Sequence, residues 1–227
     1  MRRAASRECA VADLTPVGTR RRGAGRAKRA PSVAAGRRSP PFDGGCGTLR
    51  AQGLEIQAMS VEIERAIGRE DWKCARRLIR ADLRREPENH WLLARLSLSY
   101  YEEFDYRRAL TLAQQALDLA PRCPLARWEL AGALEMLGRV RSAARGYRMI
   151  LRPGIESVAR GPCGEGRGWA RALVADCWYR LARCELKQGR RAAAVRCYRR
   201  HLALRGPGCR SIYPIGDVRR ELRDLAP

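Results

Sequence analysis

The sequence predicts an all-α protein, a right-handed solenoid of stacked antiparallel helix pairs closed by a C-terminal capping helix. Three observations support this fold class. Alanine, leucine and proline residues recur every 34 residues. Glycine or proline follows the segments that have helical apolar periodicity. The last segment is amphipathic, with an apolar face for the array and a face of arginines for solvent.

The 34-residue spacing appears in three sets: Ala75, Ala109 and Ala143; Leu83, Leu117 and Leu151; and Pro87 with Pro121. The next alanine with an aromatic residue four positions later is Ala194, which follows Ala143 by 51 residues. The 17 additional residues match a glycine-rich stretch. We therefore expect an insertion at about 152–168 between two helix pairs.

The recurring residues have direct physical roles in such an array. A small side chain where two helices cross, as at Ala131 or Ala182, allows the backbones to approach closely. Gly138 and Gly189 are expected to end first helices in the left-handed conformation. Pro87 lacks the N–H group that a continuing helix needs, so it is expected to follow a second helix.

We expect a folded domain over 59–227 with four helix pairs, about nine helices in total, and a C-terminal cap. The pairs are predicted at about 56–87, 90–121, 124–152 and 175–205, and the capping helix at about 215–225. In the cap, Ile215, Val218, Leu222 and Leu225 share one face, and Arg219, Arg220 and Arg223 lie outside it. Each pair leaves an apolar face exposed unless a neighbour covers it.

Residues 1–58 differ from the rest of the chain. They contain 12 Arg or Lys against four acidic residues, with frequent Gly, Pro and Ser and no sustained apolar periodicity. This composition predicts a disordered basic tail. Two interpretations remain open: an arm for nucleic acid or organelle targeting, or translation from a misplaced start, with the true start near Met59.

The chain resembles the tetratricopeptide repeat family, in its bacterial form, over residues 60–205. The residues that carry the resemblance are most complete in the last pair: Trp178, Leu181, Ala182, Gly189, Ala194 and Tyr198. The preceding pair offers Leu130, Ala131, Gly138, Ala143 and Tyr147. The resemblance implies a concave groove, lined by the first helix of each pair, that holds a peptide or domain of a partner protein.

By matching register, the resemblance places nine residues in that groove: Trp91, Arg95, Tyr101, Trp128, Glu129, Glu135, Tyr179, Arg180 and Arg183. Aromatic side chains beside arginine are typical of interface hot spots. The alternative is that Trp91 and Trp128 pack against the neighbouring helix pair. The leading functional hypothesis is a protein–protein interaction scaffold or adaptor.

The formal charge of +22 raises a second hypothesis, a basic helical repeat that binds RNA or another polyanion. Arginine rows on the predicted second helices support it: Arg76, Arg77 and Arg80; Arg145 and Arg148; and Arg196, Arg199 and Arg200. A solvated outer face is the ordinary explanation of such rows. Only 3 of the 46 cationic residues are Lys, which also fits the coding bias of a GC-rich genome.

No cofactor, metal or catalytic site is expected. The nine cysteines include no C-x-x-C pair, and neither of the two histidines has finger-like spacing. The glycine-rich stretch at 161–168 follows no strand and lacks the Lys-Ser or Lys-Thr of a phosphate loop, so we expect a flexible loop. Cys163 in that loop is either a reactive thiol or an ordinary surface cysteine.

No segment is apolar and long enough to cross a membrane, and no secretory signal is recognisable. We therefore expect a cytoplasmic protein with reduced thiols and no membrane partner.

Overall fold

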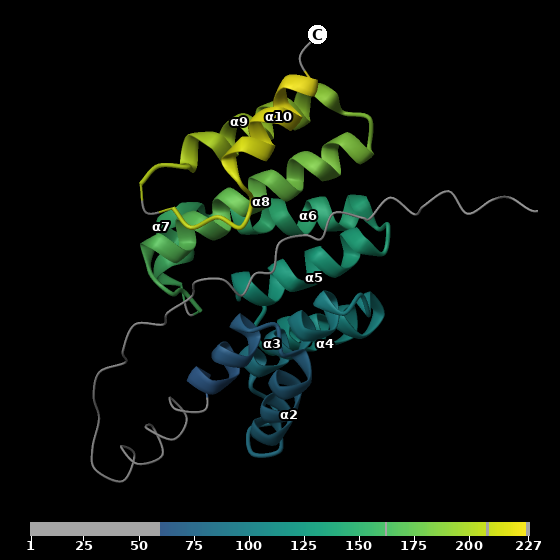
Figure 1. Cartoon of the computed structure of the whole chain (residues 1–227), viewed down its shortest axis with the longest axis vertical. Helices are drawn as coiled ribbons and strands as arrows, with labels where there is room; N and C mark the ends of the chain where they lie inside the picture. Colours follow the sequence, from purple (N-terminus) through teal and green to yellow (C-terminus); the bar gives the residue numbers. More distant parts are fainter. Residues whose placement is uncertain (1–59, 162, 208, 226–227) are drawn as a thin grey trace, which may run out of the picture. The chain divides into compact units, whose positions relative to one another are not determined.

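A computed structural model of the chain describes residues 60–161, 163–207 and 209–225 (Figure 1). The predicted tail at 1–58 lies outside the described residues. A helix over 60–68 comes first. It is followed by α2 (Trp72–Leu83), α3 (His90–Glu102), α4 (Tyr106–Leu119), α5 (Pro124–Met136), α6 (Val140–Leu151), α7 (Gly154–Arg160), α8 (Arg167–Lys187), α9 (Arg191–Leu204) and α10 (Ile215–Asp224). These residues form no strand.

Consecutive helices pack as pairs, and each pair packs on the next. The pairs are α3 with α4, α5 with α6, and α8 with α9, while α4 contacts α5 and α6 contacts α8 (Figure 1). The first helices α3 and α5 also touch each other. This stacking confirms the all-α helical solenoid predicted from the 34-residue spacing.

The backbone conformation of the turn between the two helices recurs in every pair. Four residues there have left-handed backbone angles: Glu70, Phe104, Gly138 and Gly189, with φ of 57°, 68°, 76° and 73°. Their spacing is 34, 34 and 51 residues. The two glycines were predicted to end first helices in this conformation, and that prediction is confirmed. The other two show that the same turn forms without glycine, at some cost in strain.

Side-chain caps start several helices. Asp71, Asn89 and Asp105 accept hydrogen bonds from backbone N–H groups in the first turns of α2, α3 and α4. Cys123 occupies the corresponding position before α5, where its Sγ accepts from the N–H of Ala126 at 3.5 Å. These caps satisfy backbone donors that have no partner inside the helix.

The insertion expected at about 152–168 contains a helix that the sequence did not predict. This helix, α7, precedes the expected loop at 161–168 and packs on α8, and its Val158 and Ala159 are buried. The first helix of the last pair starts at Arg167, inside the expected insertion, and runs for 21 residues. The described residues therefore contain ten helices, one more than expected, because apolar residues of the insertion could be buried against α8.

The helix α10 covers the end of the stack as a capping helix should. Val218 is fully buried against the last pair, and Leu222 packs on the same core. Arg219, Arg220 and Arg223 are exposed on the opposite face. No helix in the described ranges is both long enough and apolar enough to cross a membrane.

Candidate functional site

The predicted groove residues are mostly not available to a partner. Seven of the nine are buried: Arg95, Tyr101, Trp128, Glu129, Glu135, Tyr179 and Arg180, each at most 8% exposed. Trp91 is half-buried and Arg183 is exposed. These seven side chains are therefore not part of an accessible groove surface in this structure, which corrects the expectation for them. For Trp128 the alternative of packing against the neighbouring helix pair is supported, since it belongs to the same buried apolar cluster as Leu173 and Cys177 of α8. Its ring also lies 5.6 Å from that of Tyr147 in its own pair.

Arg180 on α8 is the centre of a buried polar network. Its Nε donates to Glu135 Oε2 on α5 at 2.7 Å, and its Nη2 donates to the Tyr101 hydroxyl on α3 at 3.1 Å. The third donor, Nη1, lies 3.3 Å from the Tyr213 hydroxyl. The same guanidinium lies 5.8 Å from the ring of Trp128. One side chain thus joins three helices and the segment before α10.

The opposite charges of this network stabilise each other in the ionised form. Burial by itself raises the pKa of Glu135, but the cations of Arg180 and Lys187 outweigh it and lower that pKa below its usual value. Burial opposes the charged form of Arg180, yet the surrounding Tyr147, Tyr213 and Glu135 raise its pKa well above the usual value. The pair therefore stays ionised inside the protein, and its role here is structural.

The chain's own C-terminal segment covers Tyr179 and Arg180. The ring of Tyr213 stacks on that of Tyr179 with centroids 3.8 Å apart. The backbone N–H of Ile212 points at Asp176 Oδ2 at 3.4 Å, and Arg205 donates to the carbonyl of Tyr213 at 2.9 Å. Glu221 on α10 accepts from the hydroxyls of Tyr179 and Tyr198. Sequence reasoning missed Tyr213, because no repeat position marks where a connecting segment runs.

An accessible hollow lies instead on the second helices, between α6 and α9. Two adjoining parts, of about 600 and about 670 Å³, share Arg148, Arg152 and Arg190. We call this surface the arginine hollow; its lining is Arg141, Arg145, Arg148, Met149, Leu151, Arg152, Trp178, Leu181, Glu185, Gln188, Arg190, Ala193, Arg196, Cys197 and Arg200. Arg141, Arg145 and Arg148 share one face of α6 because they are spaced by four and three residues.

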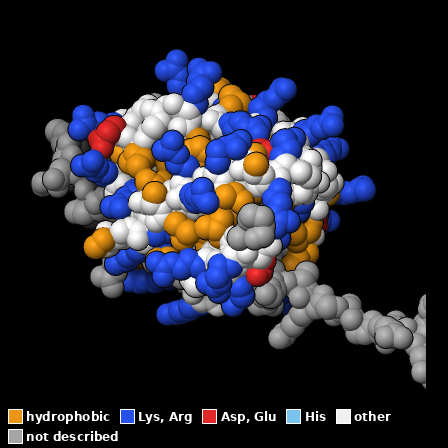
Figure 2. Space-filling view, turned by 90° about the horizontal axis from the view of Figure 1, so that it is seen from above, with side chains coloured by type: hydrophobic (Ala, Val, Ile, Leu, Met, Phe, Trp, Pro, Cys, Tyr) orange, Lys and Arg blue, Asp and Glu red, His pale blue; other side chains and the backbone are white. Residues whose placement is uncertain are grey.

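Most arginines of the hollow have no acidic partner among the described residues. Glu185 pairs with Arg148 and with Arg190. Within the described part of the chain, the other five arginines form no ion pair and are exposed: Arg141, Arg145, Arg152, Arg196 and Arg200. Figure 2 shows a face of the molecule on which Arg and Lys side chains surround apolar patches and acidic groups are few. Such a surface attracts anionic groups.

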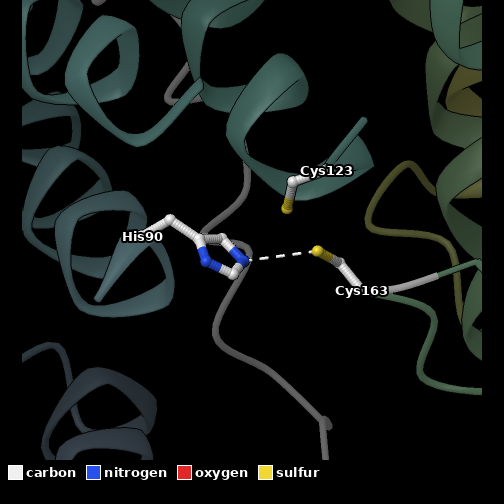
Figure 3. A group of neighbouring side chains, drawn as sticks. All are labelled: His90, Cys123 and Cys163. Carbon is white, nitrogen blue, oxygen red and sulfur yellow. Dashed lines mark hydrogen bonds between the residues drawn. The ribbon is translucent and has the colours of Figure 1, made fainter. Parts of the chain in front are cut away.

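A group of side chains of metal-binding type lies elsewhere: His90, Cys123 and Cys163 (Figure 3). Burial lowers the pKa of His90. Burial, together with the neighbouring Cys123, raises the pKa of the Cys163 thiol to about 12. A raised pKa disfavours the thiolate form that a reactive cysteine needs. The expectation that no metal site exists was based on spacing along the chain, which does not show this cluster.

No protein-family model and no curated protein sequence matches this chain. Solved structures are similar to it. A structure described as "MamA RS-1 ArsTM double mutant" has a TM-score of 0.50 at 17% identity, covering 66% of this chain and 74% of that one. A crystal structure of MamA protein has a TM-score of 0.50 at 16% identity, covering 76% and 88%. At these identities the similarity concerns the fold alone.

Proposed function

We propose that this chain is a protein-interaction module of the tetratricopeptide type that binds an acidic segment of a partner protein in the arginine hollow. The observation that carries the proposal is the set of five exposed arginines, none of which forms an ion pair with a described residue, around an apolar floor. The repeat spacing and the shared turn geometry support the family assignment.

The chemistry of the hollow favours a peptide over a simple ion. Met149 is 50% exposed beside Arg145 and Arg152. The part of about 670 Å³ has Trp178, Leu181 and Leu151 in its lining. An acidic segment with interspersed apolar residues can pair its carboxylates with the arginines while its apolar side chains cover this floor. Methionine adapts its shape to different apolar side chains, which suits such a surface.

Fewer residues support partner binding in the concave groove. Trp91 and Arg183 are the two predicted groove residues that a partner can reach in this structure. The cytoplasm, where thiols stay reduced, is the compartment that we propose, since seven described cysteines are free.

The test uses a fluorescent peptide of Glu and Leu residues in a helical pattern, with a matched Lys and Leu peptide as the control ligand. We expect the full chain to bind the acidic peptide and not the basic one. Arg145→Glu with Arg196→Glu should weaken binding at least about tenfold, because a close interfacial charge pair contributes about 1.5 kcal/mol or more. The matched variant Arg107→Glu with Arg219→Glu changes the charge equally outside the hollow and should bind normally.

Equal loss in both double variants would show that net charge alone attracts the peptide, and would contradict the proposal. Capture of a partner from the source cell, followed by mapping of its acidic segment, then identifies the natural ligand.

The formal charge of +22 supports a second candidate function, binding of RNA. It predicts that a single-stranded RNA binds with an affinity that falls steeply as salt rises, through release of counterions. RNA binding that is lost in the Arg145→Glu with Arg196→Glu variant, without any binding of the acidic peptide, would favour this alternative.

A further inference from the structure

Three potential metal ligands converge at one edge of the helix stack (Figure 3). His90 is the first residue of α3, Cys123 precedes α5, and Cys163 lies between α7 and α8. The Nε2 atom of His90 is 3.3 Å from the Sγ atom of Cys163. All three ligand atoms lie within 4.8 Å of one another, and no other trio of His, Cys or acidic side chains in the described ranges is grouped this closely.

The repeat architecture explains the convergence. Asn89 and Cys123 occupy equivalent positions 34 residues apart, each capping a first helix. Because the pairs stack in register, the N-terminal ends of α3 and α5 are neighbours. The insertion precedes the next first helix, α8, and therefore enters at the same edge. This places Cys163 opposite residues that are 73 and 40 positions earlier in the chain.

The backbone around Cys163 is held closely. The N–H of Gly164 donates to the carbonyl of Gly161 at 2.8 Å. A Cβ atom at Gly164 would overlap the backbone carbonyl of Ala159 at the end of α7. A side chain at position 164 would therefore force the loop away from α7, so glycine allows the backbone next to Cys163 to lie close to that helix.

The ligand set suits zinc. Thiolate sulfur at about 2.3 Å and imidazole nitrogen at about 2.0–2.1 Å are its usual ligands in tetrahedral geometry. In such a site the nitrogen and sulfur atoms lie about 3.6 Å apart and two sulfur atoms about 3.8 Å apart. The observed distances of 3.3 Å and less than 4.8 Å need only small side-chain adjustments. Hard cations such as Mg²⁺ and Ca²⁺ prefer oxygen ligands, which this group lacks.

We propose that His90, Cys123 and Cys163 bind one Zn²⁺ ion, with a solvent molecule as the fourth ligand. The ion ties the loop before α8 to the N-terminal ends of α3 and α5. Each thiol gives up its proton as its sulfur binds, so two protons leave for every ion that enters. Cys123 is buried, while His90 and Cys163 are partly accessible, which leaves a path from solvent.

The test uses the full chain, reduced and stripped of metal with a chelator, and Co²⁺ as the spectroscopic probe. We expect one equivalent of Co²⁺ to give a sulfur-to-metal charge-transfer band and the visible bands of a tetrahedral ion. Zn²⁺ should displace the Co²⁺ and remove both signals. Cys163→Ser and His90→Gln should each lower Zn²⁺ affinity by more than about 100-fold, since even an outer-shell partner is worth about 10- to 100-fold.

Two controls keep the result specific to this cluster. Cys209→Ser removes another partly exposed thiol and should leave the Co²⁺ spectrum and the Zn²⁺ affinity unchanged. Cys123→Ser keeps a capping oxygen at the start of α5, so the apo protein should stay folded by circular dichroism while its Co²⁺ bands are lost. Unchanged bands in Cys163→Ser and Cys123→Ser, or no charge-transfer band with one equivalent of Co²⁺ in the reduced native sequence, would overturn the proposal.

Discussion

The guanidinium of Arg180 and the carboxylate of Glu135 lie 2.7 Å apart inside the protein, although 45 residues separate them along the chain. Their side chains are only 6% and 3% exposed. A charge at this depth is tolerated because its partner is present, so each residue depends on the other.

Arg180→Met should therefore destabilise the protein by about 3–5 kcal/mol, since it leaves Glu135 buried without its main partner. The double variant with Glu135→Leu should recover much of this loss, because neither charge then remains. Urea unfolding of both variants measures the difference. Lys187→Met, which removes an exposed partner of Glu135, should cost about 1 kcal/mol or less. If the double variant loses as much stability as Arg180→Met and Glu135→Leu lose separately when added together, the two residues are not coupled.

A second prediction concerns His201, which is fully buried. Its Nδ1 faces the carbonyl of Ala175 at 2.8 Å, and its Nε2 makes no hydrogen bond in the described part of the chain. Burial lowers its pKa below the usual value. The unfolded chain therefore takes up a proton first, so this contribution to stability is complete above about pH 6.5 and is lost as the pH falls below it.

Urea unfolding at about pH 7.5 and about pH 5 should show this loss in the native sequence and a smaller loss in His201→Gln. Carboxylates and His90 titrate alike in both proteins, so the difference between the two losses reports on His201. If both proteins lose the same stability between the two pH values, His201 is not responsible.

A third prediction tests the close approach at the insertion. Gly164→Ala should destabilise the protein by about 1–3 kcal/mol, because the new methyl group overlaps the carbonyl of Ala159 and the loop must move. Gly168→Ala is the matched change four residues later, where a Cβ meets nothing within 4 Å. It should be neutral or stabilise α8 by up to about 1 kcal/mol. Thermal unfolding of the pair checks the prediction, which fails if the two variants behave alike.

A fourth prediction separates the two roles of Tyr213. Tyr213→Phe keeps the stack on Tyr179 and removes only the hydroxyl beside Arg180, so it should cost about 1 kcal/mol. Tyr213→Ala also removes the ring and should cost about 3–5 kcal/mol. Chemical denaturation distinguishes the two. A cost near zero for the alanine variant would mean that the segment before α10 does not hold the array together.

The repeat itself could be predicted from the sequence because its determinants are local and periodic. Gly138 and Gly189 have the predicted left-handed conformation. Ala131 lies at a close helix crossing, since a Cβ on Gly146 of the next helix would come within 2.9 Å of its own Cβ. In each case one small residue at a fixed repeat position allows the local backbone geometry, either a left-handed turn or a close helix crossing.

The exposure of the first-helix residues could not be predicted, because it depends on a segment outside the repeat. Tyr213 and Glu221 belong to no repeat position. Yet Tyr213 stacks on Tyr179 and contacts Arg180, and Glu221 accepts a hydrogen bond from Tyr179. The same holds for His90 and Cys163, which meet only through the path of the insertion. Register predicts which residues share a helix face, but not what the rest of the chain places on that face.

The hydrogen bond from Arg180 to Tyr101 passes over an entire helix pair, since α5 and α6 lie between α3 and α8 in the chain. Ile212 likewise packs against both the core of the last pair and that of the first. Repeat proteins in which each unit touches only its neighbours can be lengthened or shortened one unit at a time. Here the ends are linked through the interior, so evolution or engineering cannot add or delete one pair without remaking these bonds, and the number of repeats is fixed by the fold.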